Sequence, residues 1–271
     1  MVETEFTLRP MRVKDWEKLH EMEQEIFKED SISRDQFIRS ISTRYFAALE
    51  LDGQLIGQLT LSRFSDNEGV LNRIGVAKSF QRRGLGTYLL KHAIDWFEKQ
   101  GCISVVHLYT QDYNTSAQSL YKKFGFEISG TTWHYFVPFA TIKSEGRYSC
   151  QHILDTEIDY VGKQYSTLPA AQIRNYLEDT TTKYYILTLK DKEGKLRGAT
   201  RFTPSFPGSF PFEISGTEGF DDFMKGIEKL SLPVFNYVRA VFTDNPELAE
   251  LCEERNYHLH HRLYKMSIRM R

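Results

Sequence analysis

The sequence predicts a mixed α/β fold with a mostly antiparallel sheet, present twice along the chain. Strand and helix patterns alternate through the first half, and two segments of that half recur in the same order in the second half. The length of 271 residues exceeds the ~100–200 residues of a usual single domain. The composition, 41% hydrophobic and 26% charged, is typical of a folded soluble protein. We therefore expect two domains that each bury a hydrophobic core.

Apolar periodicity divides the first half into elements. Period-two alternation predicts strands, and apolar side chains three and four positions apart predict amphipathic helices. In chain order the predicted elements are a strand over 4–11, helices over 14–27 and 34–41, a hairpin over 44–64, a strand over 69–76, a helix from 85 to near 101, a strand over 102–110, a helix over 115–124 and a strand over 131–139. The order is therefore β-α-α-β-β-β-α-β-α-β.

Turn and cap residues support these boundaries. Ser33 and Gln36 have the spacing of a capping box at the start of the second helix. Asp52-Gly53 lies between two β-rich runs and is a strong short-range signal for a hairpin. Asn114 is a favourable N-cap for the last helix of this half.

Two segments of the first half have counterparts in the second. The stretch from Arg44 aligns with the stretch from Lys183, whose turn is two residues longer, and the stretch from Asn114 aligns with the one from Asn245. The alignment pairs Tyr45 with Tyr184, Gly53 with Gly194, Gly57 with Gly198, Asn114 with Asn245, Leu120 with Leu251 and Tyr121 with Cys252. Two shared anchors in the same order indicate a duplicated fold.

The two copies differ where the first has "QRRGLG" at residues 81–86 and the second has "SFPGSFPFEISGTEGF" at residues 205–220. Those prolines are expected to break a strand, and no basic glycine turn precedes the following helix. We interpret the second copy as degenerate, with its "FPGSFPF" segment as either a lid or the seam between the halves. The expected domains are residues 1–142 and 150–271, joined by a linker over about 143–149.

Charge and cysteine content restrict the function classes. The formal net charge of -1 gives no overall basic field, so nucleic acid is not expected as a partner. Cys102, Cys150 and Cys252 are widely spaced, which argues against a disulfide framework or a zinc site and favours buried thiols in a reducing cytosol. The first residues lack a signal-peptide pattern, and no apolar run approaches ~18 residues. We therefore expect a cytoplasmic protein without a membrane span.

The stretch "GVAKSFQRRGLGTYLL" at residues 75–90 has the features of an anion-binding site. A strand that ends in a glycine-rich turn and opens a helix points free backbone N–H groups at one place, with the positive end of the helix dipole behind them. Gly84 and Gly86 permit a tight backbone, and Arg82 and Arg83 add positive charge. The Walker and Rossmann patterns are absent, because the turn lacks Gly-Lys-Ser/Thr and a third glycine.

This stretch resembles the pyrophosphate-binding segment of the GNAT superfamily of acyl-CoA-dependent N-acetyltransferases, and "NTSAQSLYKKFGF" at residues 114–126 resembles its second signature. The two lie in the family's order and at about its spacing, and the resemblance covers nearly all of the first half. It implies a catalytic GNAT domain, a degenerate GNAT-like second domain, and acetyl-CoA as cosubstrate without a metal. One departure is Lys78-Ser79, where many members carry a proline.

The resemblance also assigns binding roles to residues. In the family, the strand before the turn pairs with the pantetheine arm, the amides of the turn hold the pyrophosphate, and an asparagine contacts the acyl-CoA arm. Here those roles fall on Ile74, Gly75 and Val76 for the strand, on Gln81, Arg82, Arg83, Gly84, Leu85, Gly86 and Thr87 for the turn, and on Asn114 for the asparagine. Tyr121 matches the family's helix tyrosine near the thioester sulfur.

The implied reaction is direct transfer of an acetyl group to an amine. Tyr121, with a reference pKa of ~10, is protonated at neutral pH and can give a proton to the leaving thiolate. An alkyl ammonium, with a pKa of ~10.4, must lose a proton before it attacks, so a base is required. Many relatives carry a glutamate on the fourth strand at the position that is Val70 here. Glu68 and His107 are the candidate bases in this sequence.

Several alternatives stay open. The acceptor is expected to be a primary amine of a small molecule or peptide, and a homodimer is one of the open assemblies. A non-catalytic acyl-CoA sensor or scaffold is the alternative function, favoured by the absent strand glutamate and opposed by the retained Tyr121 and Asn114. Tandem lobes also resemble enzymes that acylate amino-sugar thiols or add amino acids from tRNA, and the balanced charge argues against tRNA. His258, His260 and His261 need further ligands for a metal site, so we interpret them as part of a strand.

Overall fold

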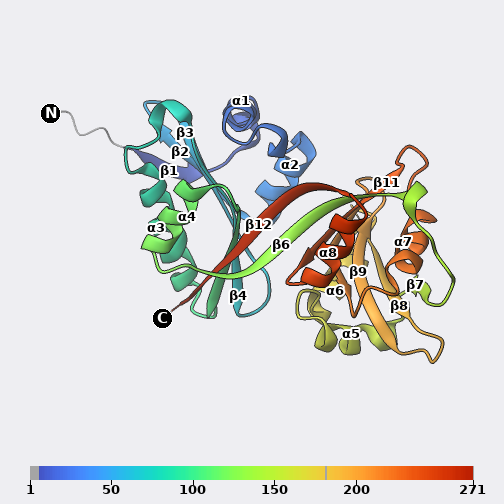
Figure 1. The fold of residues 1–271 in the computed structure, drawn as a ribbon. Helices are drawn as coiled ribbons and strands as arrows, with labels where there is room; N and C mark the ends of the chain where they lie inside the picture. The colour runs from blue at the N-terminus through green and yellow to red at the C-terminus, as the bar shows by residue number, and fades with distance from the viewer. Residues whose placement is uncertain (1–5, 181, 271) are drawn as a thin grey trace. The chain divides into compact units, whose positions relative to one another are not determined.

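The computed structural model describes residues 6–180 and 182–270, in which strands and helices alternate as the sequence predicts (Figure 1). The α-helices are α1 (Trp16–Ile26), α2 (Arg34–Thr43), α3 (Leu85–Lys99), α4 (Thr115–Lys123), α5 (Ile158–Gln164), α6 (Ala170–Glu178), α7 (Phe220–Glu228) and α8 (Pro246–Glu254). The strands are β1 (Thr7–Pro10), β2 (Tyr45–Leu51), β3 (Gln54–Arg63), β4 (Glu68–Val76), β5 (Val105–Gln111), β6 (Glu127–Pro138), β7 (Ser149–His152), β8 (Tyr185–Lys190), β9 (Leu196–Thr203), β10 (Gly208–Ile214), β11 (Tyr237–Thr243) and β12 (His258–Arg269). Short 3-10 helices are η1 (Val13–Asp15), η2 (Lys28–Asp30), η3 (Lys78–Phe80), η4 (Phe139–Thr141) and η5 (Asp155–Glu157). Residues 4 and 5 of the predicted first strand lie outside the described residues.

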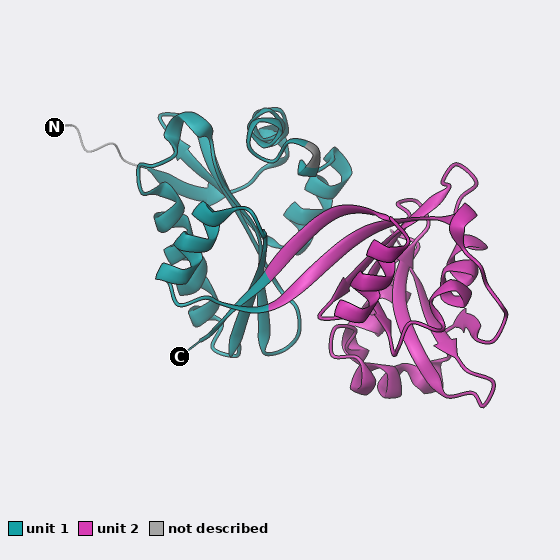
Figure 2. Ribbon diagram, viewed as in Figure 1, with its two compact units in different colours: residues 1–129, 265–271 teal, residues 130–264 magenta. Residues whose placement is uncertain are grey.

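The chain divides into two compact units, unit 1 of residues 1–129 and 265–271 and unit 2 of residues 130–264 (Figure 2). These limits differ from the predicted domains over 1–142 and 150–271. The reason is that β6 and β12 each contribute residues to both units, so the C-terminal end of the chain belongs to unit 1. Pairing between strands far apart in sequence leaves no local signal, and a boundary placed after a strand pattern therefore misses it.

Within unit 1 the strand neighbours run β1-β2-β3-β4-β5-β12-β6. Strands β1 to β4 pair antiparallel, whereas β4 and β5 pair in parallel. Asn72 is an extra residue in β4 that shifts the β3–β4 register between Leu71 and Arg73. Leu71 and Arg73 therefore point to opposite faces of the sheet. A Cβ on Gly69, before the bulge, would meet α3, and one on Gly75, after it, would meet the end of α1. Helices α1 and α3 therefore cover opposite faces of β4.

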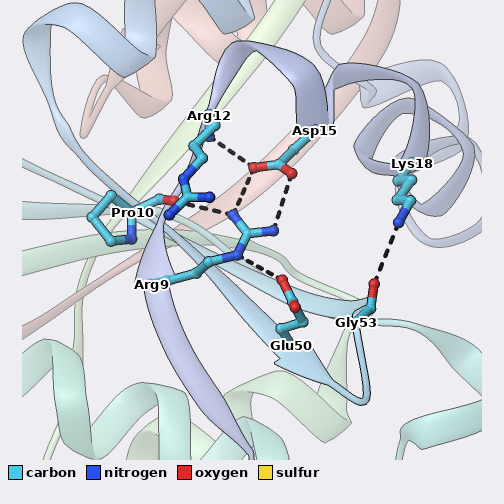
Figure 3. Close-up of polar contacts among 7 residues, drawn as sticks. All are labelled: Arg9, Pro10, Arg12, Asp15, Lys18, Glu50 and Gly53. Carbon is cyan, nitrogen blue, oxygen red and sulfur yellow. Dashed lines mark hydrogen bonds and ion pairs between the residues drawn. The ribbon is translucent and has the colours of Figure 1, made fainter.

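Polar contacts connect β1, the turn before α1 and β2 in unit 1. The Arg9 guanidinium of β1 donates to both carboxylate oxygens of Asp15, at 2.7 and 3.0 Å, and to Glu50 of β2 at 2.6 Å (Figure 3). The buried Asp15 also accepts from the Arg12 N–H at 2.8 Å (Figure 3). These contacts set where the chain leaves β1 and enters α1, which fixes one side of the sheet that carries the candidate site.

The local signals at helix and hairpin ends are confirmed. Ser33 Oγ accepts from the Gln36 N–H at 3.3 Å while Gln36 Oε1 accepts from the Ser33 N–H at 2.8 Å, which is a capping box. Asp52 and Gly53 have φ values of 48° and 77°, the pair of positive values that a tight type I′ hairpin turn requires. Short-range chemistry therefore decides these element boundaries.

The duplicated fold is confirmed by matching irregularities in the two units. Hairpins β2–β3 and β8–β9 each have a register shift next to a glycine that pairs with a leucine. The pair is Gly57 and Leu49 in the first hairpin and Gly198 and Leu189 in the second. A Cβ on Gly57 would approach a carbonyl oxygen of the next strand to 3.0 Å, and one on Gly198 to 2.7 Å. Strands β4–β5 of unit 1 and β10–β11 of unit 2 are parallel neighbours at the same place in each copy.

Unit 2 has strand neighbours in the order β12-β6-β11-β10-β9-β8-β7 and a core on each face of its sheet. One core joins the sheet to α7 and α8, and the other joins it to α5 and α6. The prediction that prolines break a strand here is wrong, because β10 includes Pro211. The β9–β10 register shifts between Ser209 and Phe212, which accommodates the proline. The residues predicted as a linker are held by unit 2, since the Asp222 carboxylate accepts from the N–H groups of Gly146 and Tyr148 at 2.9 and 2.8 Å.

Two further expectations concern thiols and membranes. All three cysteines are free. Cys252 is buried as expected, Cys150 is only partly buried, and Cys102 is exposed, so the expectation of a buried thiol is wrong at Cys102. Cys102 lies in the turn between α3 and β5, where the chain is at the surface. Across residues 6–180 and 182–270, no helix has the combined length and apolar character needed to cross a membrane.

Candidate functional site

A cavity of about 700 Å³ opens in unit 1 where β4 ends and where α3 and α4 begin. Its volume is in the ~300–1,000 Å³ range of small-molecule and cofactor sites. The lining residues are Ile74, Gly75, Val76, Gln81, Arg82, Gly84, Gly86, Thr87, Asn114, Thr115, Ser116, Ala117, Ser119, Leu120, Tyr121 and Lys123. The structure therefore brings together most of the residues that the sequence predicts for acetyl-CoA binding. Arg83 and Leu85 are predicted residues outside this lining.

The cavity exists because two parallel strands separate. Strands β4 and β5 pair only over Glu68–Leu71 and Val105–Leu108, while β4 continues along β3 to Val76. The edge of β4 at residues 74–76 is consequently left open on the side that faces the cavity. Backbone N–H and C=O groups on an open strand edge can pair with an extended ligand.

The turn after β4 directs the start of α3 toward the cavity. Gln81 Nε2 donates to the Val76 carbonyl at 2.9 Å, which holds the turn against the end of the strand. Arg82 and Gly84 have φ values of 63° and 83°, and a Cβ on Gly84 would have no atom within 4 Å. Left-handed backbone is costly for most residues but not for glycine, so Gly84 suits this N-cap position.

The N-terminus of α3 is uncapped, in contrast to α4. Among the described residues no side chain accepts from the first turn of α3, whose N-cap is Gly84. The first N–H groups of a helix have no acceptor within the helix, and they carry the positive end of its dipole. At α4, Asn114 Oδ1 accepts from the Ala117 N–H at 3.1 Å. The start of α3 therefore presents free N–H donors to the cavity.

The two arginines of the turn have different positions. Arg82 lines the cavity, whereas Arg83 lies over the Phe80 ring, 5.2 Å from its centroid. Leu85 is buried in the core, with 3% of its surface exposed, so its side chain is structural and only its backbone is at the helix start. The predicted role of the turn thus falls on its backbone and on Arg82.

Helix α4 contributes residues that the sequence reasoning missed. Thr115, Ser119 and Lys123 lie four positions apart, on one helix face, and they line the cavity together with Ser116. The i, i+4, i+8 spacing of two hydroxyls and an amine is the signal that marks this face. With Arg82 the lining has two cationic side chains and, among the described lining residues, none that is acidic, which suits an anionic ligand.

Tyr121 lies on the buried side of α4 at the cavity, with 6% of its surface exposed. Its ring packs edge-on against Phe126, with the centroids 6.1 Å apart. Burial raises the pKa of Tyr121 to about 12, so its hydroxyl stays protonated across the neutral range. Full proton transfer from this phenol to a thiolate with a usual thiol pKa of ~8.5 is uphill. The hydroxyl is therefore better suited to stabilising a thiolate by a hydrogen bond than to giving up its proton.

The candidate bases lie apart from this lining. Neither Glu68 nor His107 is among the described residues that line the cavity. His107 is the register partner of Val70, and its Nε2 atom is 3.6 Å from Glu68 Oε2. Its Nδ1 atom is 2.7 Å from Ser267 Oγ on the C-terminal strand β12. The structure therefore joins the two candidates to each other.

Burial lowers the pKa of His107 below its usual value, and the positive charge of Lys265 acts in the same direction while Glu68 opposes both. The neutral imidazole is consequently the main form at neutral pH, and neutral imidazole is the form that accepts a proton. The side chain of Glu68 is 36% exposed, so this pair has contact with solvent.

Glu23 of α1 is a fully buried carboxylate that contacts Arg73 of β4. Its oxygens accept from Gln58 Nε2 at 2.6 Å, from Arg73 Nε at 2.8 Å and from the Ile32 N–H at 2.7 Å. These contacts tie α1 to the sheet.

Comparison with known proteins identifies the region that contains this cavity. The model of the acetyltransferase (GNAT) family matches residues 9–126. N-alpha-acetyltransferase 50 of Danio rerio is 38% identical over 63 residues, which are 23% of this chain and 38% of that protein. The match spans about a third to a half of the length of the first curated relatives.

Solved structures show the same fold over the whole chain. A GCN5-related N-acetyltransferase from Sphaerobacter thermophilus has a TM-score of 0.72 at 12% identity and is matched over 98% of this chain and 96% of its own. A tandem GNAT protein from the clavulanic acid biosynthesis pathway has a TM-score of 0.69 at 11% identity, over 98% of this chain and 99% of its own. Residues 9–126 therefore match the acetyltransferase (GNAT) family, and the chain has the fold of a tandem GNAT protein.

Proposed function

We propose that unit 1 is an N-acetyltransferase that uses acetyl-CoA and acetylates a primary amine of a small molecule or peptide. The observation that carries the proposal is the uncapped start of α3, which opens on a cavity whose described lining has Arg82 and Lys123 and no carboxylate. A helix start with free N–H groups and nearby cations is a site for phosphate groups. Acetyltransferase names among the relatives, such as N-alpha-acetyltransferase 50, support the reaction class.

The residues of the cavity fit the parts of acetyl-CoA. The N–H groups of Gly84 to Thr87, with Arg82, would hold the pyrophosphate, because both are donors to anionic oxygens. The open edge of β4 at residues 74–76 would pair with the amide groups of the pantetheine arm. The Asn114 amide nitrogen donates to no other described residue, so it can bind the arm while the oxygen caps α4.

When bound, acetyl-CoA supplies an acetyl thioester whose carbonyl carbon is open to attack by an amine. The chain's own residues then orient the reactants and stabilise charge. The open N–H groups of β4 can donate to the thioester oxygen as negative charge develops on it. Tyr121 holds its proton, with a pKa raised to about 12, and would donate a hydrogen bond to the sulfur. The His107–Glu68 pair accepts the proton of the acceptor ammonium through water.

A second candidate function is a non-catalytic acyl-CoA sensor. The observation that favours it is the position of the base candidates outside the cavity lining. Ser267, the neighbour of His107, instead lines a different cavity in unit 1, of about 840 Å³. The retained, buried Tyr121 at the CoA cavity favours the enzyme, since acyl-CoA binding alone needs no hydroxyl at that point.

Two measurements on the same preparation separate these functions. Calorimetry with CoA and acetyl-CoA tests whether the cavity is occupied, and release of free thiol from acetyl-CoA over a panel of amines tests turnover. The panel includes amino acids, polyamines, aminoglycosides and short peptides with a free N-terminus. Turnover with one acceptor supports the enzyme. Tight CoA binding without turnover on any member supports the sensor, and absence of CoA binding contradicts both.

A further inference from the structure

A guanidinium without a polar partner among the described residues lies between aromatic rings in unit 2. Arg201 is on β9, partly buried, and its guanidinium carbon is 4.8 Å from the centroid of the Tyr176 ring and 5.2 Å from that of Tyr184. The ring of Phe210 is 5.7 Å away on β10. Three rings from α6, β10 and the loop before β8 thus surround one charge.

No anion compensates this charge within the described part of the chain. The Arg201 side chain donates no hydrogen bond and forms no ion pair there, and its Nε atom is buried without an acceptor. A buried or half-buried charge without hydrogen bonds is unfavourable, and proteins usually pair it with a carboxylate. The other arginine at this part of β9, Arg197, follows the usual pattern, since its Nε donates to Asp191 at 2.8 Å.

The rings leave the hydrogen-bonding edge of Arg201 available. Cation–π contacts use the flat faces of a guanidinium, whereas its five N–H groups point outward in the plane. A carboxylate or phosphate that arrives in that plane accepts two parallel hydrogen bonds. The aromatic contacts therefore hold the guanidinium in one orientation without occupying the groups that would bind an anion.

A second arginine lies on the same face of the sheet. Arg239 of β11 has its guanidinium carbon 4.8 Å from the Phe206 ring centroid. Phe202 and Ala240 belong to the core that the sheet forms with α7 and α8. Arg201 and Arg239 are their neighbours in sequence, so they point to the opposite face of the sheet. Gly208 of β10 pairs with Thr203 of β9 on one side and with Arg239 of β11 on the other. The two arginines therefore lie on the two strands that flank β10.

The rings over these arginines reach solvent. Phe206 is 53% exposed and Phe210 is 41% exposed. Both come from the segment at residues 206–212 that the sequence singles out as a lid or a seam. Aromatic residues, including phenylalanine, and arginine are enriched at binding interfaces. The segment therefore places exposed apolar contact area beside the two arginines of β9 and β11.

We propose that these residues form a binding site for an organic anion that joins a carboxylate or phosphate group to a flat ring. The site, here named the arginine cluster, consists of Tyr176, Tyr184, Arg201, Phe206, Phe210 and Arg239. Arg201 binds the anionic group in its plane, and the exposed rings of Phe206 and Phe210 contact the body of the ligand. The arginine cluster uses residues of unit 2 alone and does not depend on acetyl transfer in unit 1.

The test is calorimetry on the full chain with phenyl phosphate, benzoate and inorganic phosphate as probes. Phenyl phosphate or benzoate is expected to bind saturably, and inorganic phosphate at least several-fold more weakly, because it has no ring to contact the phenylalanines. Arg201→Gln is expected to reduce the affinity for the probe that binds at least tenfold. The matched control is Arg174→Gln on α6, which removes an arginine that is already paired with Asp159 at 2.8 Å and should leave binding unchanged. Gly84→Val, which disables the cavity in unit 1, should also leave it unchanged.

A thermal measurement separates binding from a structural role. Arg201→Met removes an unpaired charge but keeps apolar contact with the rings, so its Tm without ligand is expected to equal or exceed that of the parent. Millimolar probes that fail to bind, or equal affinity in Arg201→Gln, would overturn the proposal. A marked loss of Tm in Arg201→Met would overturn it as well, because the arginine would then be structural.

Discussion

The Nδ1 atom of His107 lies 2.7 Å from the hydroxyl oxygen of Ser267, although 160 positions separate the two residues in the chain. Ser267 Oγ is in turn 2.5 Å from Ser129 Oγ on β6, and the other imidazole nitrogen faces Glu68 at 3.6 Å. Both nitrogens of this ring are therefore oriented by side chains from other strands. The C-terminal end of β12 completes the surroundings of the candidate base.

The pH dependence of turnover tests the role of His107. Burial and Lys265 lower the pKa of His107, and only the neutral ring accepts a proton. We expect kcat/KM to rise with pH through an apparent pKa below the usual ~6.5 and to be level near neutrality, apart from titration of the acceptor amine at higher pH. In His107→Gln this limb should disappear and kcat should fall by ~10²–10⁴-fold. The measurement is a pH profile for both proteins.

Variants of the neighbouring serine provide the control for that profile. Ser267→Ala removes the contact to Nδ1 and should move the acidic limb, while Ser267→Thr keeps a hydroxyl and should restore it. If His107→Gln retains both the rate and the limb of the parent protein, His107 is not the base and its contacts serve only to join strands.

Tyr121→Phe tests the hydrogen bond to the sulfur. The change deletes one buried hydroxyl and leaves the ring that packs on Phe126, so folding should be retained. We expect kcat to fall by ~10²-fold, in the range of a lost donor to developing charge, while the Kd for acetyl-CoA changes less than twofold. Steady-state kinetics and calorimetry measure the two values. Tyr113→Phe, at a side chain that is 75% exposed, is the control, and an equal loss of kcat in both variants would contradict the assignment.

Gly84→Val tests the location of the phosphate site at the start of α3. Gly84 and Gly101, near the two ends of this helix, have φ values of 83° and 67°, and a Cβ on either would have no atom within 4 Å. Valine at each position should therefore cost a similar ~1–2 kcal/mol of stability from left-handed backbone. Only Gly84→Val should abolish CoA binding, because its side chain enters the cavity. Retained CoA binding in Gly84→Val would place the phosphate site elsewhere.

The duplicated fold supplies a matched pair of helix caps. Asn114 Oδ1 accepts from the Ala117 N–H at 3.1 Å, and Asn245 Oδ1 accepts from the Leu248 N–H at 3.0 Å. Alanine at either position should reduce the free energy of unfolding by ~1 kcal/mol, since each loses one N-cap. Asn114→Ala should in addition weaken acetyl-CoA binding, because Asn114 lines the cavity. Chemical unfolding and calorimetry give both values, and equal effects of the two variants on binding would assign Asn114 to capping alone.

Much of the fold and of the cavity at the end of β4 is predictable from local sequence. The capping box at Ser33 and the Asp52-Gly53 turn involve residues a few positions apart, so the sequence shows them directly. The cavity lining is largely foreseen because the glycine turn and the α4 signature are contiguous motifs. The α4 face of Thr115, Ser119 and Lys123 was missed, although its fourfold spacing is visible in the sequence.

Other features depend on residues that are distant in the chain. The unit boundaries, with β12 completing unit 1, follow from strand pairing that has no local pattern. The exposed Cys102 and the strand through Pro211 show that residue type alone does not decide burial or pairing, since neighbouring elements decide both.

The sequence by itself determined the duplicated α/β fold, the glycine turn and the two family signatures, because periodicity, caps and turn residues act within a few positions. Only the tertiary structure decided that Ser267 contacts His107, that the base candidates lie outside the lining of the cavity at the end of β4, and that Arg201 lies among rings with no anion from residues 6–180 and 182–270 beside it. The physical reason is that burial, pairing and charge compensation depend on which strands and helices become neighbours in space.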